Sequence, residues 1–226
     1  MITAEVWQCV LQVQGEDAFT KGNGTGTLLR LDGRQVLITA DHLTTGEPEE
    51  YFNFRAPFIT GSGWSYKPLV RLSQPLPGVD IAVFDFPEDH GALLNDSLPL
   101  GMDDAGFSQD VFLLGHPYGL SLQLGSEADR FELPLVKKGI LAGQKFEHDV
   151  KSVFVDCIAN PGFSGGPAVF QVTGSNRWKF LGVIKGQYVQ DPPEGDIEGL
   201  ARTPAGITHV TEISSGLRRL REVRDF

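Results

Sequence analysis

Cysteine is scarce in this chain of 226 residues, which contains only Cys9 and Cys157. Small secreted domains held together by disulfides carry more cysteines, and neither residue stands at zinc-ligand spacing from another cysteine or a histidine. Each lies inside an apolar run that is typical of a strand. We therefore expect two separate thiols that pack as small apolar side chains in a reducing compartment, with no metal or other cofactor.

Long apolar runs and basic charge are also lacking. No stretch reaches the roughly eighteen apolar residues of a transmembrane helix, so no membrane segment is expected. The first residues lack the basic and apolar regions of a secretory signal, which predicts a cytoplasmic protein, or a periplasmic one if a leader has been removed. Asp and Glu number 29 against 19 Lys and Arg, for a formal charge of −10. Nucleic-acid binding needs a basic face and is not expected.

The chain is instead rich in glycine, proline and short runs of β-branched or aromatic residues. With 27 Gly and 14 Pro, frequent turns separate these runs, a pattern typical of an all-β protein. The runs that predict strands are 6–14, 35–39, 81–86, 111–114, 153–157, 168–172 and 178–184. One helix is predicted from Val210 to about Val223, because Ile213, Leu217 and Leu220 follow helical spacing.

The most informative segment surrounds Ser164 and reads Asn160-Pro161-Gly162-Phe163-Ser164-Gly165-Gly166. Its glycines allow a tight turn and a close approach of the backbone to a reacting carbonyl. The backbone N–H groups of Gly162 and Ser164 would then form an oxyanion hole beside the serine hydroxyl. Taken alone, the segment also fits a glycine-rich hairpin turn with no catalytic role.

Two polar residues stand upstream at the edges of apolar runs. His42 follows the run 36–40, and Asp80 precedes the run 81–84, where a solvated carboxylate is not expected. The order His42, Asp80, Ser164 is that of a chymotrypsin-type triad, in which a carboxylate orients the imidazole base of a hydroxyl nucleophile. Singly, each also fits a structural role, as a hydrogen-bonded histidine or an aspartate that ends a turn.

Segments along most of the chain resemble trypsin-like serine proteases, and most closely the protease domain of the HtrA/Deg type. The matching segments, in order, are 22–27, 36–43, 80–83, 98–101, 114–120, 138–140, 156–166, 182–184 and 205–210. The resemblance implies two six-stranded antiparallel β-barrels, over about residues 1–100 and 106–210, followed by a C-terminal helix over about 211–223. Together they would form a single peptidase domain over residues 1–226.

The same resemblance implies a serine endopeptidase that cleaves proteins or peptides through an acyl-enzyme. Ser164 would attack the carbonyl, His42 would carry the proton and Asp80 would orient the imidazole. The residues expected to bind substrate are Ile158, Ala159, Asn160, Lys185, Gly186 and Gln187. The apolar residues among them favour a pocket for aliphatic or small side chains. His209 is on a strand near this pocket, where it would read an acidic side chain or point away.

The chain departs from these proteases at several positions. Phe163 stands where animal digestive proteases have an aspartate that pairs with a new N-terminus, so activation by N-terminal cleavage is not expected. No PDZ domain is expected after residue 226. Lys185 is unusual beside a substrate and would pair with a nearby carboxylate or with the substrate itself.

Two further segments carry expectations of their own. His116, in a Gly-His-Pro-Tyr-Gly turn, is expected to have a packing role. The loop 188–204 is acidic and predicts a mobile rim that orders on binding a substrate or partner.

Three other functions fit parts of the sequence. The first is a catalytically silent protein that uses a protease fold for binding, and the second is a protease activated by a regulatory protein partner. The third is an α/β-hydrolase esterase, because residues 162–166 also match G-x-S-x-G. In that fold the serine turn must open into a helix, whereas residues 167–172 read as a strand.

Overall fold

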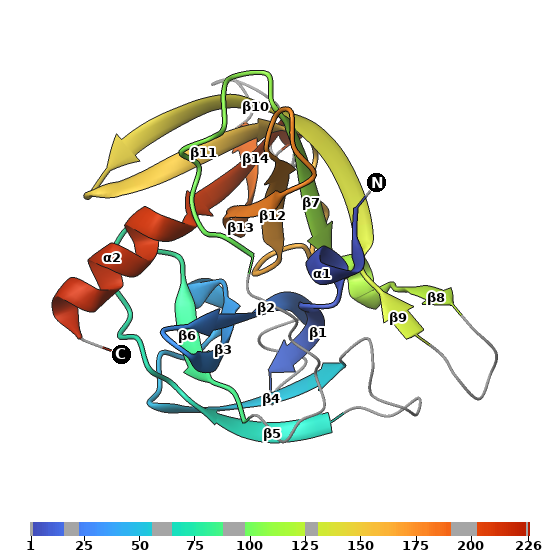
Figure 1. Ribbon diagram of the computed structural model, residues 1–226. Helices are drawn as coiled ribbons and strands as arrows, with labels where there is room; N and C mark the ends of the chain where they lie inside the picture. The colour runs from blue at the N-terminus through green and yellow to red at the C-terminus, as the bar shows by residue number, and fades with distance from the viewer. Residues whose placement is uncertain are drawn as a thin grey trace, which may run out of the picture.

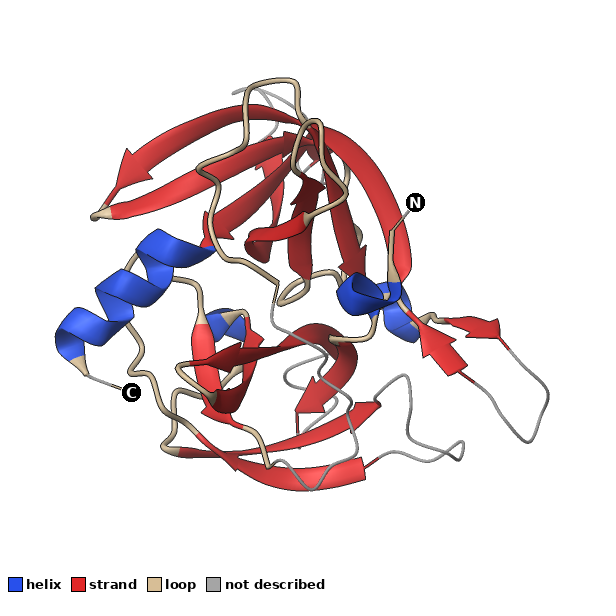
Figure 2. Cartoon of the chain, in the orientation of Figure 1, coloured by secondary structure: helices blue, strands red, loops and turns tan. Residues whose placement is uncertain are grey.

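The computed structural model describes residues 2–15, 23–55, 65–87, 98–124, 131–190, 203–224 and 226. Strands dominate, and Figure 1 shows them gathered into two bodies with helix α2 (Ile213–Val223) along one side. Figure 2, coloured by secondary structure, shows how few helical turns lie between the strands. The expected all-β fold with a C-terminal helix is confirmed.

The lower body in Figure 1 is a six-stranded antiparallel sheet. Its strands, in spatial order, are β5 (Ser65–Val70), β4 (Glu49–Arg55), β1 (Val10–Gly15), β2 (Asn23–Leu31), β3 (Arg34–Thr39) and β6 (Ala82–Asp85). The sheet curls until its two ends meet at an isolated bridge between Arg71 and Phe84. In the β3–β6 pair Thr39 lies opposite Ala82, which places the residues after β3 beside those before β6.

The upper body is a closed barrel of six antiparallel strands. Its order is β10 (Leu135–Glu147), β11 (Val150–Asp156), β14 (Thr203–Glu212), β13 (Trp178–Gln190), β12 (Pro167–Gln171) and β7 (Asp110–Gly115). A two-stranded ribbon, β8 (Leu122–Leu124) and β9 (Phe131–Leu133), extends to one side. The two bodies together give the double-barrel architecture that the sequence predicts.

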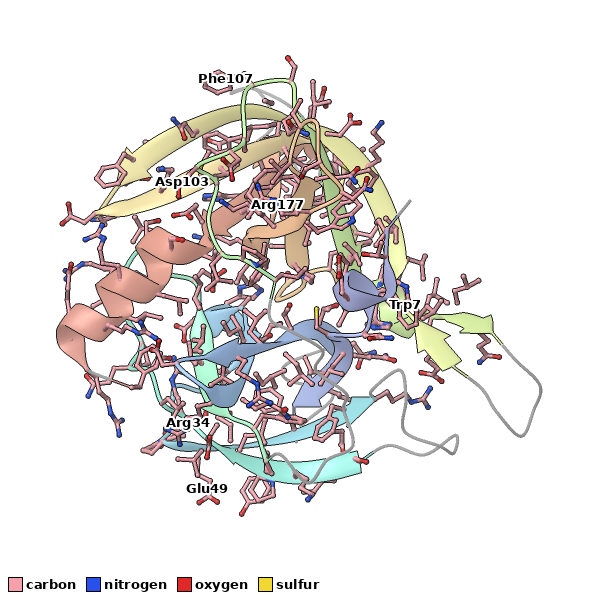
Figure 3. All side chains as sticks on the ribbon, viewed as in Figure 1. Trp7, Arg34, Glu49, Asp103, Phe107 and Arg177 are labelled. Carbon is pink, nitrogen blue, oxygen red and sulfur yellow. The ribbon has the colours of Figure 1, made fainter. Side chains whose placement is uncertain are left out.

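Each body encloses an apolar core. The first sheet buries Phe52, Phe54 and Phe84, and the barrel buries Val153 and Val155 from β11. Alternate residues of β11 point inward, as a strand with one buried face requires. Figure 3 shows side chains filling both interiors.

Helix α2 links the barrel to the first sheet. Residues 210–212 still belong to β14, so the helix begins at Ile213 rather than at Val210. The buried Glu212 carboxylate caps it by accepting hydrogen bonds from the N–H groups of Ser214 (3.0 Å) and Ser215 (2.8 Å). Ile213, Leu217 and Leu220, the residues with helical spacing, pack into an apolar cluster that joins the first sheet to part of the barrel.

One prediction is wrong at the N-terminus. The run 6–14 predicts a single strand, but Ala4–Trp7 form helix α1 and β1 begins at Val10. Val6 is fully buried, and the Cys9 thiol donates a hydrogen bond to the Val6 carbonyl (3.0 Å). Packing against the core therefore overrides the strand propensity of Val6 and Trp7.

Both cysteines are free thiols, as the sequence predicts. Burial raises the pKa of the Cys9 thiol to about 12, and a backbone hydrogen bond offsets only part of that effect. Cys9 is therefore a neutral core residue. Across the described ranges, no helix is long and apolar enough to cross a membrane, and no group of three metal-ligating side chains is found.

Candidate active site

His42 and Asp80 meet at one end of the first sheet. β3 is followed by a short 3-10 helix, Asp41–Leu43, and Asp80 lies just before β6, the partner strand of β3. The Asp80 carboxylate accepts two hydrogen bonds from His42, one from the backbone N–H (2.9 Å) and one from the ring Nδ1–H (2.8 Å). The second bond selects the imidazole tautomer with its proton on Nδ1 and leaves Nε2 as a proton acceptor.

The environment of Asp80 keeps its carboxyl group ionised. The residue is only 8% exposed. Burial by itself would raise the pKa of Asp80, but the hydrogen bonds from His42, together with the charges of His42 and Lys185, outweigh it and lower that pKa. Asp80 therefore presents a buried negative charge to the imidazole at neutral pH.

The segment around Ser164 forms the tight turn that its glycines predict. The Phe163 N–H donates to the Asn160 carbonyl (3.1 Å), which closes the turn. As in a type II turn, Pro161 takes the second position and Gly162 the third, with φ of +101°. A side chain at Gly162 would be strained at this φ and would also collide with the backbone of the His116 loop.

The backbone N–H groups of Gly162 and Ser164 have no hydrogen-bond partner among the described residues. The Pro161 carbonyl accepts a hydrogen bond from the Tyr118 N–H (3.0 Å), and N–H and C=O point in opposite directions across a trans peptide. The Gly162 N–H therefore points away from Tyr118. The same reasoning applies to Ser164, because the carbonyl before it accepts from the Gly166 N–H (2.9 Å).

The serine turn belongs to the barrel but is bonded to the first sheet. Thr25 on β2 donates its backbone N–H to the Ser164 carbonyl (2.9 Å) and its hydroxyl to the Gly162 carbonyl (2.7 Å). The approach is closest at Gly165, where an added Cβ would lie 2.0 Å from the Thr25 carbonyl oxygen and 2.2 Å from the Thr39 hydroxyl. This contact holds the turn against the end of β3, three residues before His42.

The hydroxyl of Ser164 is directed to the barrel rather than to the imidazole. Its Oγ donates a hydrogen bond to the Lys185 carbonyl (3.1 Å) on β13. No hydrogen bond joins Ser164 and His42 among the interactions of the described residues. The structure thus brings His42 and Asp80 into direct contact, and it docks the serine turn beside them with its hydroxyl facing another acceptor.

A cleft of about 840 Å³ opens beside His42 and Asp80. It is lined by Asp41, His42, residues 75–80, Lys185, Gly186, Gln187 and His209. Both carboxylates of the cleft are already engaged, Asp41 by Arg71 and Asp80 by His42. Lys185 is exposed, lines the cleft and makes no ion pair with a described residue, and its positive charge acts on the nearby Asp80.

The other three residues expected to bind substrate lie in and just before the serine turn, outside the lining of this cleft. Ile158 is 46% exposed, whereas Ala159 is buried and donates its N–H to the Thr208 hydroxyl (3.1 Å). The Asn160 side chain is partly buried and accepts a hydrogen bond from Lys137 (2.5 Å). The predicted substrate-binding residues therefore fall into two groups. Lys185, Gly186 and Gln187 line the cleft, and the other three lie outside its lining.

His209 lies in the wall of the cleft. Its ring is tilted on Phe154 at a centroid distance of 5.4 Å, and its buried Nε2 has no hydrogen-bond partner among the described residues. Burial, and then the positive charge of Lys185, lower the pKa of His209. The ring is therefore neutral at neutral pH and adds no second charge to the cleft.

Lys137 was not among the predicted site residues, but its ammonium group contacts the start of the serine turn. The sequence indicates only that Lys137 and Lys138 are neighbours in a strand, where successive side chains point to opposite faces of the sheet. Most of the predicted acidic rim, residues 191–202, lies outside the described residues. Its first and last residues continue β13 and β14.

The residues that follow the serine turn decide against the esterase alternative. An α/β-hydrolase needs a helix directly after its nucleophile. Here residues 167–171 form β12, which pairs with β13 and β7 inside the barrel. The G-x-S-x-G match is therefore coincidental.

Comparisons with known proteins agree with this geometry. The trypsin-like peptidase domain family matches residues 24–176. No curated protein matches the chain. The solved structures that resemble it include the HtrA-type protease AlgW with a tripeptide, at TM-score 0.63 and 16% identity, covering 97% of this chain and 61% of that one.

Two further structures extend the comparison. A serine endoprotease from Yersinia pestis has TM-score 0.63 and 16% identity, over 97% of this chain and 65% of its own. A serine-to-alanine variant of Rv3671c from M. tuberculosis, in an inactive form, has TM-score 0.60 and 18% identity, over 97% and 89%. At these identities the likeness is one of fold, and this chain spans 61% and 65% of the first two proteins.

Proposed function

The chain belongs to the trypsin-like peptidase domain family, and from that membership we propose a serine endopeptidase whose catalytic triad is His42, Asp80 and Ser164. The observation that carries the proposal is the double hydrogen bond from His42 to the buried Asp80 carboxylate, beside the docked turn that bears Ser164. The substrates would be proteins or peptides, and the reaction needs no cofactor.

The proposed reaction begins with a rotation of the Ser164 hydroxyl from the Lys185 carbonyl toward His42. Nε2 of His42 then accepts the hydroxyl proton while Oγ attacks the peptide carbonyl and forms an acyl-enzyme. The same nitrogen returns the proton to the leaving amine. Asp80 stays ionised and stabilises the imidazolium that forms in between.

The N–H groups of Gly162 and Ser164 are proposed to bind the oxyanion. Both lack a partner among the described residues, and the carbonyls next to them are held on the opposite side of the turn. A preorganised donor of this kind contributes about 3 kcal/mol to transition-state stabilisation.

The proposed pocket for the residue before the scissile bond lies between Ile158–Asn160 and Lys185–Gln187. Its apolar wall suits aliphatic or small side chains, with discrimination of about 1–3 kcal/mol per methylene. Lys185 would attract an acidic side chain elsewhere in the substrate, because the carboxylates that share its cleft already have partners.

Labelling with a fluorophosphonate tests the activity directly. The wild-type protein should be labelled at Ser164, and Ser164→Ala should remove the label and lower peptide turnover about a million-fold while its thermal unfolding stays unchanged. Unaltered peptidase activity in the variant would refute the proposal. Sequencing of the new N-termini that each protein produces in a proteome would then reveal the residue preference.

A second candidate is a silent or partner-activated protein with the same fold. It is favoured by one observation, the bond of the Ser164 hydroxyl to the Lys185 carbonyl instead of to His42. A protein of this kind would resist the fluorophosphonate when pure. Labelling that appears only on addition of a cell extract would identify a protease activated by a regulatory partner.

A further inference from the structure

Lys137 makes three contacts with the segment that leads into Ser164. Its ammonium group donates to the Ile158 carbonyl (2.6 Å) and to the side-chain oxygen of Asn160 (2.5 Å). It also lies 5.8 Å from the centroid of the Phe163 ring. One charged group on β10 therefore bridges the residues on both sides of Gly162.

The contacted residues are those that shape the turn. The Asn160 carbonyl closes the turn by accepting the Phe163 N–H, and the Asn160 side chain also reaches the Tyr118 hydroxyl (3.4 Å). The Phe163 ring is fully buried against β7, where an added Cβ at Gly115 would lie 2.8 Å from it. Lys137 thus contacts the residues at the start of the turn through hydrogen bonds, while the buried Phe163 ring packs the other end of the turn against β7.

The turn needs such an anchor because of Gly162. A glycine with φ of +101° can rotate its flanking peptides at little cost, and a rotated peptide would present a carbonyl where the free N–H now stands. Hydrogen bonds from a charged donor are about twice as strong as neutral ones and resist that rotation. Without the ammonium group, the Ile158 carbonyl and the Asn160 side chain would each lose a donor.

We propose that Lys137 is a positioning residue that holds the Asn160–Ser164 turn with its N–H groups ready to bind an oxyanion. This inference rests on the proposed peptidase function and deepens it. Lys137 has no contact with His42 or Asp80, so any effect on the oxyanion donors passes through the segment 158–163 that it contacts.

Lys138, the next residue of β10, provides a matched control. Its ammonium group pairs with Asp110 (2.9 Å) and lies 6.0 Å from the centroid of the Phe112 ring, on the other face of the strand. The two lysines thus share a strand, a charge and a contact with an aromatic ring. They differ in that only Lys137 reaches the serine turn.

The test compares Lys137→Met, Lys137→Arg and Lys138→Met with the wild type, using a peptide substrate and a peptide aldehyde whose adduct carries an oxyanion. We expect Lys137→Met to lower kcat about 10- to 100-fold and weaken aldehyde binding equally, with KM changed less than about threefold. Lys137→Arg should recover most of the loss, and Lys138→Met should match the wild type. A kcat in Lys137→Met within about twofold of wild type, or an equal loss in Lys138→Met, would overturn the proposal.

Hydrogen exchange separates this proposal from the proposed function. In the Ser164→Ala background, Lys137→Met should speed exchange of the Phe163 N–H, which bonds to Asn160, about tenfold or more, and Lys138→Met should not. This measurement needs no catalysis, so it tests the anchor even if the protein cleaves no peptide. Equal protection of that amide in both lysine variants would refute the anchoring role.

Discussion

His116 should make the folded protein sensitive to mild acid. The residue is 1% exposed, and neither ring nitrogen makes a hydrogen bond of good geometry with a described residue. Burial lowers its pKa from the ordinary 6.5 to about 4, although backbone groups of Leu120 and Val10 offset part of the effect and the charge of Arg55 adds to it. The folded protein therefore keeps this ring neutral where an unfolded chain would protonate it.

The sign and size of the effect follow from linkage. Below pH 6.5 the unfolded chain binds a proton that the folded protein does not bind until about pH 4, so acid favours unfolding across that window. With about 1.4 kcal/mol for each pKa unit, the loss is about 2 kcal/mol at pH 5 and about 3 kcal/mol at pH 4. His116 also donates its backbone N–H to the Thr25 hydroxyl (3.0 Å), which holds the Gly162 carbonyl. His116 is therefore linked through Thr25 to the docked serine turn.

The measurement is urea unfolding of the wild type and His116→Leu at several pH values between 7.5 and 4.5. Leucine removes the titratable ring, so the variant should gain about 2 kcal/mol relative to the wild type as the pH falls from 7.5 to 5. Acid effects of other groups cancel in this difference. His148→Asn, which changes an exposed histidine, serves as the control and should follow the wild type. A stability difference between wild type and His116→Leu that stays constant with pH would refute the reasoning.

Two other substitutions test the site and its docking. Asp80→Asn should lower kcat about 10⁴-fold in a peptide assay with little change in unfolding, because the amide cannot accept both His42 hydrogen bonds; a loss below about tenfold would contradict the assigned role. Gly165→Ala should be at least about 2 kcal/mol less stable in urea than Gly174→Ala, and it should lose labelling at Ser164. Both glycines have positive φ, but a Cβ at Gly165 meets Thr25 and Thr39 while one at Gly174 meets nothing within 4 Å. Equal stability of the two alanine variants would show that the close approach is unimportant.

Much of the fold could be predicted from local sequence, because the residue pattern that predicts a strand lies within a few consecutive positions. The runs on β3, β6 and β11 were readable for that reason. The contact between His42 and Asp80 also has a local signal, since both residues flank strands that are neighbours in the sheet. Helix α1 was missed because the burial of Val6 depends on residues elsewhere in the chain.

The arrangement of side chains in the site was harder to predict from the sequence than the strands were. The serine turn was predicted from its glycines, whose conformational freedom is a property of the residue itself. The side chains around it come from other strands, so a list of chemically suitable residues could not separate Lys185, in the cleft wall, from Ile158, outside it. The role of the adjacent lysines on β10 was equally hidden, since alternation assigns opposite faces without saying which face meets the turn.

By itself, the sequence determined an all-β chain with a C-terminal helix. It also placed a histidine, an aspartate and a serine at strand ends, in the chain order of a chymotrypsin-type triad. Only the tertiary structure decided that the Ser164 hydroxyl meets the Lys185 carbonyl, that Lys137 contacts the serine turn and that Thr25 docks this turn on the first sheet. These contacts join residues 21 to 137 positions apart. Two of them depend on how distant strands meet within the barrel, and the Thr25 contact depends on how the barrel packs on the first sheet, which no local pattern encodes.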